Sequence, residues 1–377
     1  MALNGTFDGM EIENGVLKKY HGSDTEVTIP NGVTSIGKFA FHEKLNITSI
    51  AVPDSVTIIE VGAFAGCVSL KHVTIPDSVT EIKDAALLNC SSLESITIGS
   101  GVTKIGRGAF KGCKNLTNVI IGEGVTVIDE MAFSECENLK SVTIPDSVTS
   151  IGYCAFYGCG NLTSITIPDS VTRIGDGVFA GCDKLQYEEY GNAKYLGNHL
   201  IEAAKNDITD VDIRQGTKTI AESAFYACEK LTNVTIPDSV LYIGRNAFRG
   251  CKMLTNAIIE DSTLTIDKYA FSLCKNLKHV RIGKEVQRIG FCAFHGCSAL
   301  KSIIIPISVE FIENCAFSGC DNITIYAEAE TKPRGWDFYW NCDRNEEIID
   351  EYDCDNCRID EVSNEDFECS VVWGYKK

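Results

Sequence analysis

The strongest constraint on this chain is a unit of 23 residues that recurs along most of its length without a slip in register. The unit is clearest from Leu162 to Lys184, where it reads LTSITIPDSVTRIGDGVFAGCDK. Repeats of this length indicate stacked supersecondary units that share one continuous core, so the sequence predicts a solenoid. The first apolar residue of the unit lies at Ile47, Leu70, Leu93, Leu116, Leu139, Leu162, Leu185, Ile208, Leu231, Leu254, Leu277, Leu300 and Ile323.

Length and charge narrow the class of protein. The chain has 377 residues, of which 52 are acidic and 34 basic, and its net charge is -18. A repeat array grows in one dimension, so this length predicts one long repeat domain rather than two or three globular ones. The negative balance repels phosphate backbones, which argues against a nucleic-acid partner.

One unit predicts two extended segments joined by turns. Ile165 and Ile167 alternate with polar residues, which is typical of a strand with one buried face. Val171 and Ile174 predict a second, shorter extended piece, and a compact helical turn is expected through Phe179. We therefore expect an α/β repeat solenoid. It should carry a parallel sheet on one face and short extended segments and short helical turns on the other.

Two buried columns are also predicted, one of rings and one of thiols. A phenylalanine recurs in nearly every unit, so its rings should form a spine opposite the sheet. A cysteine recurs three residues before the next anchor, and a small thiol at one repeated position indicates packing rather than a disulfide framework. The cysteines are Cys67, Cys90, Cys113, Cys136, Cys159, Cys182, Cys228, Cys251, Cys274, Cys297 and Cys320.

The repeated pattern Leu-x-x-Ile-x-Ile-Pro-x-x-Val-x-x-Ile-Gly-x-x-Ala-Phe-x-x-Cys resembles the BspA-like, or Treponema pallidum-type, leucine-rich repeat. The resemblance extends from Asp24 to about Ile325. It implies a right-handed leucine-rich-repeat superhelix that recognises other proteins, often in host-matrix or cell-surface adhesion. It implies no catalytic residues and no cofactor.

Three regions are expected along the chain. Residues 1–23 should form an N-terminal cap, residues 24–330 the solenoid, and residues 331–377 a C-terminal cap. Caps are needed because a terminal coil would otherwise expose apolar side chains and strand edges. Five aromatic residues of the second cap are predicted to seal the core, with a sugar-binding platform as the alternative: Trp336, Phe338, Tyr339, Trp340 and Trp373.

The unit at residues 185–207 keeps the length of 23 residues but departs from the repeat pattern. Gly197 and Asn198 stand between two short apolar segments, which predicts a hairpin in place of the helical turn. This unit is either a tolerated irregular coil or a purpose-built feature. One tyrosine and three acids nearby form a candidate patch that could recognise a basic partner: Tyr187, Glu189, Asp210 and Asp212.

Four cysteines near the C-terminus form the strongest chemical constellation. Cys354 and Cys357 make a CxxC pair, and Cys342 and Cys369 flank it at a distance of twelve residues on each side. Four thiolates could hold a tetrahedral zinc ion, two could form a disulfide, or all could stay unbonded in an acidic cap. No resident cofactor is predicted, and zinc at these cysteines is left as an alternative.

The sequence favours a non-enzymatic protein that binds another protein through its sheet face. A structural or self-associating solenoid is the second hypothesis, and an enzyme with Asp210 and Asp212 as acid–base groups is the third. The residues before Lys18 lack a basic and an apolar run, and no window approaches a membrane span. The residues therefore predict a cytoplasmic location, whereas the resemblance suggests the cell surface as the alternative.

Overall fold

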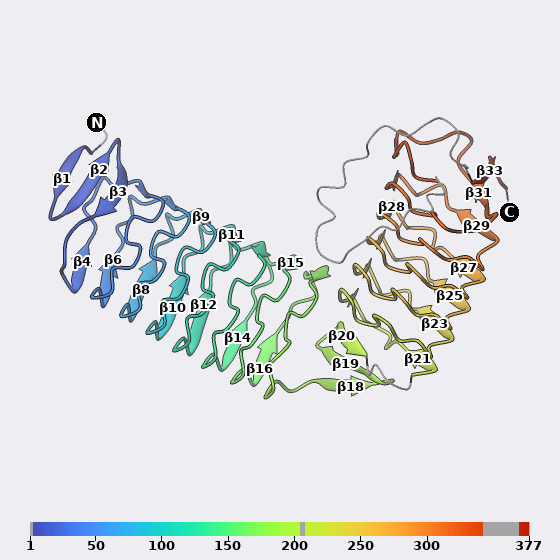
Figure 1. Cartoon of the computed structure of the whole chain (residues 1–377), viewed down its shortest axis with the longest axis horizontal. Coiled ribbons are helices and arrows are strands. Elements are labelled where there is room, and N and C mark those ends of the chain that lie inside the picture. The colour runs from blue at the N-terminus through green and yellow to red at the C-terminus, as the bar shows by residue number, and fades with distance from the viewer. Residues whose placement is uncertain (1–2, 204–207, 342–368, 377) are drawn as a thin grey trace. The chain divides into compact units, whose positions relative to one another are not determined.

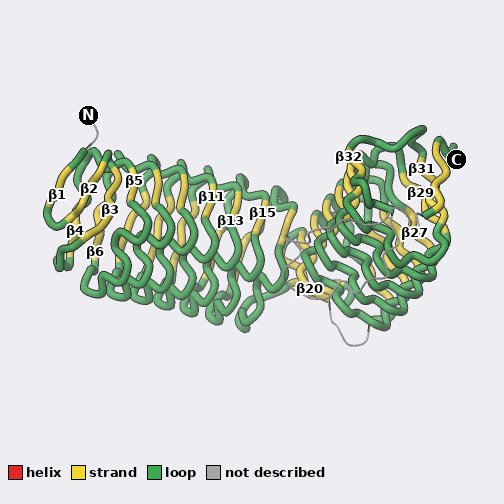
Figure 2. The backbone as a smooth tube through the Cα atoms, turned by 45° about the horizontal axis from the view of Figure 1, so that its top comes forward, coloured by secondary structure: helices red, strands yellow, loops and turns green. Residues whose placement is uncertain are grey.

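The computed structural model describes residues 3–203, 208–341 and 369–376. Within these residues the chain is built from strands, turns and loops, and it contains no helix (Figure 2). It divides into two compact units, Met1–Glu188 and Glu189–Lys377, which we call unit 1 and unit 2. Each unit is a stack of coils.

Unit 1 has two sheets, and each coil contributes a strand to both (Figure 1). The longer strands form a seven-stranded parallel sheet: β4 (Glu26–Thr28), β6 (Ser49–Ala51), β8 (His72–Ile75), β10 (Ser95–Ile98), β12 (Asn118–Ile121), β14 (Ser141–Thr143) and β16 (Ser164–Thr166). The second sheet has ten strands and begins with three antiparallel ones: β1 (Gly5–Phe7), β2 (Met10–Glu13), β3 (Val16–Tyr20), β5 (Ser35–Ile36), β7 (Ile58–Ile59), β9 (Glu81–Ile82), β11 (Lys104–Ile105), β13 (Val127–Ile128), β15 (Ser150–Ile151) and β17 (Arg173–Ile174).

Unit 2 repeats this plan. A four-stranded parallel sheet contains β21 (Asp210–Asp212), β23 (Asn233–Ile236), β25 (Asn256–Ile259) and β27 (His279–Arg281), and a three-stranded one contains β29 (Ser302–Ile305), β31 (Thr324–Ala327) and β33 (Ser370–Trp373). A nine-stranded sheet begins at the boundary between the units: β18 (Glu188–Tyr190), β19 (Ala193–Leu196), β20 (His199–Ala203), β22 (Thr219–Ile220), β24 (Tyr242–Ile243), β26 (Thr265–Ile266), β28 (Arg288–Ile289), β30 (Phe311–Ile312) and β32 (Gly335–Trp336).

The repeat length sets the strand register. Each residue of β10 pairs with the residue 23 positions later in β12, as in the pairs Ser95 with Asn118 and Ile96 with Val119. Equivalent side chains therefore stack in columns along each unit. Because successive strand residues point to opposite faces, Ile96 is buried and Ser95 is exposed.

The predicted columns of rings and thiols are present in both units. Neighbouring phenylalanine rings stack nearly parallel, with centroids 5.1 Å apart for Phe110 and Phe133 and 4.8 Å apart for Phe225 and Phe248. The thiol column is buried, and most of its thiols donate to the carbonyl of a phenylalanine in the preceding coil, as Cys67 does to Phe41 at 3.1 Å. Cys113 donates instead to the carbonyl of Leu87 at 3.3 Å, because that coil has a leucine at the phenylalanine position. Each of these carbonyls also accepts a backbone N–H, as Phe41 does from Lys44 at 3.1 Å, so the thiol is a second donor to a buried acceptor.

The predicted helical turns are wrong. The segment around each phenylalanine contains two residues with positive φ four positions apart, such as Met131 (φ 53°) and Glu135 (φ 60°) around Phe133. The coil that has Leu87 in place of the phenylalanine shows the same pair, Ala85 (φ 54°) and Asn89 (φ 57°). These residues interrupt the right-handed helical backbone. Alternate N–H groups donate to the next coil instead of to the residue four positions earlier. The N–H of Phe64, for example, donates to Ala86 at 2.8 Å. The turn is thus bonded between coils, like the sheets.

The aromatic residues of the last coils divide into buried and exposed sets. Trp336 and Trp340 are buried, and Trp340 lies against Phe317 at the end of the ring column, with centroids 6.2 Å apart. Trp373 packs on Trp336 at 5.6 Å. Phe338 differs from the prediction because it is 78% exposed. It lies two residues from each inward-facing tryptophan, so the turn directs it to the opposite side.

Candidate functional site

The longer strands of each unit present a sheet face whose outward residues are free of any core constraint. In unit 1 these residues form two columns, Glu26, Ser49, His72, Ser95, Asn118, Ser141 and Ser164 beside Thr28, Ala51, Thr74, Thr97, Ile120, Thr143 and Thr166. Nine of these fourteen residues are serine or threonine. The face of unit 1 therefore offers nearly the same small polar groups in each coil.

Unit 2 places different chemistry at the equivalent positions. From β21 to β29 its outward columns contain Asp210, Asn233, Asn256, His279 and Ser302 beside Asp212, Thr235, Ile258, Arg281 and Ile304. Two of these ten residues are serine or threonine. The coils of both units follow the same plan of two strands per repeat, so folding does not require this change.

A groove of about 440 Å³ lies on the face of unit 2. Residues of β23, β25, β27 and β29 line it, so it crosses four consecutive coils. Among the described strands, the hydrogen-bonded ladder stops at β27 and starts again at β29. The groove therefore crosses the place where the parallel sheet of unit 2 is interrupted.

One side of the face carries a ladder of polar groups. The Asn256 side-chain amide donates to the Asn233 side-chain oxygen at 2.6 Å, and the Asn233 amide lies 3.4 Å from an oxygen of Asp210. Each amide also contacts the hydroxyl of the threonine directly before its strand, at 2.9 Å for Thr232 and 3.1 Å for Thr255. These bonds hold the amide groups in one orientation along the face.

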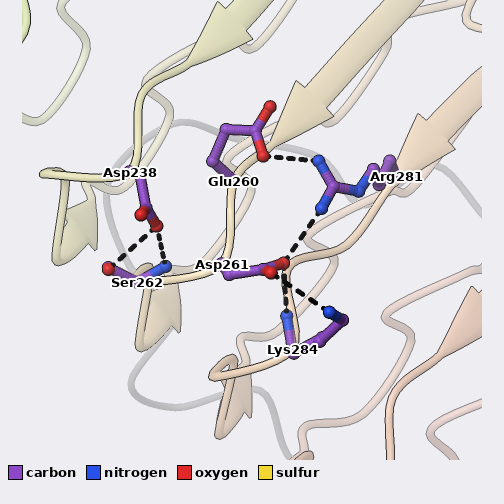
Figure 3. Close-up of polar contacts among 6 residues, drawn as sticks. All are labelled: Asp238, Glu260, Asp261, Ser262, Arg281 and Lys284. Atoms are coloured by element: carbon purple, nitrogen blue, oxygen red, sulfur yellow. Dashed lines mark hydrogen bonds and ion pairs between the residues drawn. The ribbon is translucent and has the colours of Figure 1, made fainter.

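The other side carries a fixed guanidinium group. Arg281 forms an ion pair with Glu260, and its Nη2 lies 3.0 Å from Oδ1 of Asp261 (Figure 3). The hydrogen bond with Glu260 raises the pKa of Arg281, and the backbone N–H of Lys284 lowers the pKa of Asp261. Lys284 Nζ also lies 3.4 Å from Asp261. The carboxylates thus hold Arg281 in position at the groove.

Hydrogen bonds between coils also hold the turn beside the ion pairs of Arg281. Asp238 accepts hydrogen bonds from the backbone N–H of Ser262 at 2.8 Å and from its hydroxyl at 2.9 Å (Figure 3). The same arrangement occurs in unit 1, where Asp77 accepts from both groups of Ser100. The Asp238 contact is therefore a feature of the repeat, whereas the ion pairs of Arg281 are particular to this coil.

The structure separates the residues of the predicted patch. Tyr187 lies in unit 1, before β18, and is half-buried. Glu189 is exposed in β18, at the end of the nine-stranded sheet. Asp210 and Asp212 lie together on the outward side of β21, which belongs to the four-stranded sheet. Only the two aspartates therefore share a strand.

Tyr190 is a further residue of this region that the sequence reasoning did not select. Its hydroxyl donates to Asp212 at 2.8 Å, and this bond raises the pKa of Tyr190. Tyr190 lies in the same short segment as Tyr187, but its contact with Asp212 depends on how β18 departs from the repeat. No sequence signal distinguishes the two tyrosines.

The predicted zinc ligands Cys342, Cys354 and Cys357 lie outside the described residues. Cys369 is described, and it is half-buried with its backbone N–H donating to Asn341 at 3.1 Å. In the part of the chain that the structure covers, no group of three or more His, Cys, Asp or Glu side chains is placed to hold a metal ion. The same residues include no helix long and apolar enough to cross a membrane.

Stacked coils with one parallel strand in each of two sheets and a shared ring column define a leucine-rich-repeat solenoid. The model of the BspA type leucine-rich repeat region matches residues 11–137, 103–204 and 203–324. The chain belongs to this family, whose repeats serve as scaffolds rather than as catalytic domains. Among curated proteins, none matches the chain.

Solved bacterial structures are similar to the chain. A leucine-rich repeat protein from Bacteroides ovatus is 26% identical, with 85% of this chain and 77% of that chain covered and a TM-score of 0.46. A leucine-rich cell surface protein from Faecalibacterium prausnitzii is 31% identical, with 82% and 89% covered and a TM-score of 0.36. A leucine-rich repeat protein from Eubacterium ventriosum is 23% identical, with 85% and 90% covered and a TM-score of 0.36.

Proposed function

We propose that the protein is a non-enzymatic binder that recognises an extended segment of another protein across β23 to β29 of unit 2. The observation that carries the proposal is the groove on this face, lined by side chains that change from coil to coil. The leucine-rich-repeat fold is generally used for protein–protein interaction, which supports this class of function. No catalytic step is included in the proposal.

The chemistry of the groove indicates which segment it would bind. Ile258 is 38% exposed and Ile304 is half-buried, so both can contact an aliphatic side chain. Arg281 uses part of its five N–H donors for Glu260 and Asp261, and the remaining donors can bind a carboxylate. The proposed partner segment therefore carries an aliphatic residue next to an acidic one.

The size of the face sets the length of the segment. Strands in a sheet lie about 4.8 Å apart, so β23 to β29 span roughly 14 Å. An extended chain covers this distance with about five residues. Asn233 and Asn256 present oriented amides along the same path and can bond to the backbone of the bound segment.

Selection from a phage library of random 12-residue peptides tests the proposal. Peptides that bind the full-length protein should contain an aliphatic residue beside Asp or Glu. Ile258→Ser and Arg281→Glu should each weaken binding of the selected peptides about tenfold or more, because each removes one of the two contacts. The matched control is Ile120→Ser, which changes the equivalent outward position of unit 1 and should leave binding unchanged. Selected peptides that bind all three variants equally would contradict the proposal.

The acidic end of the same face gives a second part of the proposal. Asp210 and Asp212 lie one strand before the groove, and Asp210 joins the amide ladder through Asn233. We propose that these two aspartates favour a basic residue in the partner. Asp210→Asn with Asp212→Asn should then weaken only those selected peptides that carry Lys or Arg at one end.

The proposal extends to adhesion at a cell surface, because the 31% identical relative is described as a cell surface protein. Self-association is the alternative function. It is favoured by the exposure of Phe338 (78%) and Val372 (42%) near the end of unit 2. Light scattering across a range of protein concentrations separates these functions. A monomer mass that stays constant with protein concentration supports recognition of a different protein. A mass that increases with concentration in the wild type, but not in a Phe338→Ser variant, supports self-association.

A further inference from the structure

Two hairpins in this chain have the same geometry although their sequences differ. The first, β2 with β3, opens unit 1, and the second, β19 with β20, lies just after the start of unit 2 (Figure 1). In both cases a short strand precedes the hairpin and pairs with it, β1 in unit 1 and β18 at the unit boundary. Each set of three strands begins the sheet that the two-residue strands continue.

The residue pairing is identical once 183 is added to each number of the first hairpin. Met10 pairs with Tyr20 and Ala193 with Ala203, while Ile12 pairs with Leu17 and Tyr195 with Leu200. The register shift also recurs, between Glu11 and Ile12 in the first hairpin and between Lys194 and Tyr195 in the second. A bulge at the same place in both hairpins is a specific geometric match.

The hairpins join their first coils through equivalent hydrogen bonds. The N–H of Gly37 donates to Leu17 at 2.8 Å, and the N–H of Ala221 donates to Leu200 at 2.9 Å. The N–H of the last hairpin residue also bonds to the coil in both units, Tyr20 to Ala40 and Ala203 to Ala224, each at 2.9 Å. The coil residues of these pairs are 184 apart, which is eight repeats of 23 residues.

Both hairpins also bury the same positions. Leu17 and Leu200 are completely buried, and Ile12 and Tyr195 are 3% and 0% exposed. The first strand after each hairpin carries an acidic residue at the same outward position, Glu26 in β4 and Asp210 in β21. Each of these strands stands at the end of its sheet, where charge discourages pairing with another chain.

We propose that residues 188–203 are an internal N-terminal cap and that unit 2 is a separate folding domain, joined in tandem to unit 1. A repeat stack needs a cap at its first coil, and one in the middle of a chain has a role only where a new stack begins. The break in the repeat at residues 185–207 is then the start of a second domain. This inference does not depend on the proposed binding function, but it makes the groove part of a self-contained domain.

The test compares two equivalent substitutions in the full-length chain by hydrogen exchange. Leu17→Asp should remove amide protection from unit 1 and leave unit 2 protected. Leu200→Asp should do the reverse. A third variant, Leu139→Asp, serves as the interior control and should affect unit 1 alone. Loss of protection in β14 and β16 caused by Leu200→Asp would overturn the inference, as would full protection of unit 2 in that variant.

An insertion tests the same inference without removing any buried side chain. Six Gly and Ser residues placed between Gln186 and Tyr187 should shift the melting temperature by less than about 2 °C, because they fall at the end of unit 1, directly before the proposed cap. The matched insertion between Thr163 and Ser164 lies one repeat earlier, inside unit 1, and should lower the melting temperature of unit 1 by more than about 5 °C. Equal losses from both insertions would show that the stack is continuous.

Discussion

Units 1 and 2 have the same core and different faces. Positions 138 residues apart, or six repeats, are equivalent in both, so Phe110 corresponds to Phe248 and Ile120 to Ile258. The buried members of such pairs are the same residue type in nearly every coil, whereas the outward residues of unit 1 are mostly serine and threonine and those of unit 2 are not. Packing fixes the inward residues, and the outward residues are free to serve recognition.

The largest expected effect tests whether the two cores are equivalent. Phe110→Ala and Phe248→Ala each remove a fully buried ring that stacks within the phenylalanine column. Each substitution should lower the free energy of unfolding of its own unit by about 3–5 kcal/mol. Denaturant unfolding followed by hydrogen exchange measures both losses. A loss in one unit that is less than half that in the other would break the comparison.

A smaller loss of unfolding free energy should appear at alkaline pH, and it should occur in both units. Burial raises the pKa of Cys67 to about 12 and raises those of Cys90, Cys113 and Cys297 well above their ordinary value. Because the folded pKa exceeds the unfolded one, each thiol contributes full stability below about pH 8.5 and loses it as the pH rises toward the folded pKa. The decline should be about 1.4 kcal/mol per pH unit for each thiol.

Unfolding curves recorded between pH 7 and pH 11 measure this decline. Cys113→Ser is the control, because a serine hydroxyl does not titrate in this range and the variant should lose less stability per pH unit. An unfolding free energy that is the same at pH 8 and pH 10.5 would contradict the burial of the thiol column.

The smallest expected change in stability comes from substitutions on the outward sheet faces of the two units. Ile120 is 54% exposed and Ile258 is 38% exposed, so Ile120→Ser and Ile258→Ser should each change the free energy of unfolding by less than about 0.5 kcal/mol. Thermal unfolding of the two variants checks this. A large loss from Ile258→Ser alone would mean that the face of unit 2 differs for stability rather than for recognition.

The sequence predicted the stacked strands because its period fixes which residues align. The same period places Ile258 and Arg281 at the outward position of Thr235, one and two repeats later. It could not predict the backbone at Ala85 and Asn89, because left-handed residues there are stabilised by hydrogen bonds between coils that no local pattern records. It also could not show the groove, whose lining crosses the interruption of the ladder between β27 and β29.

The hairpin within residues 185–207 illustrates the same limit. Gly197 and Asn198 mark a turn in the sequence, and the structure has a hairpin there. The sequence does not show its similarity to the N-terminal hairpin, because residues 5–20 and 188–203 are identical only at Leu17 and Leu200. Strand pairing tolerates exchange of side chains on both faces as long as the turns and the buried pattern persist.

The central claim is that recognition belongs to the face of unit 2, and site-specific photocrosslinking tests it most directly. A p-benzoylphenylalanine side chain is placed at Thr235 or at Thr97, its equivalent in unit 1, in the full-length protein. Each protein is irradiated with a library-selected peptide, and the covalent product is measured by mass spectrometry. We predict a peptide adduct from position 235 and none from position 97. Equal adducts from both positions, or an adduct from position 97 alone, would contradict the claim.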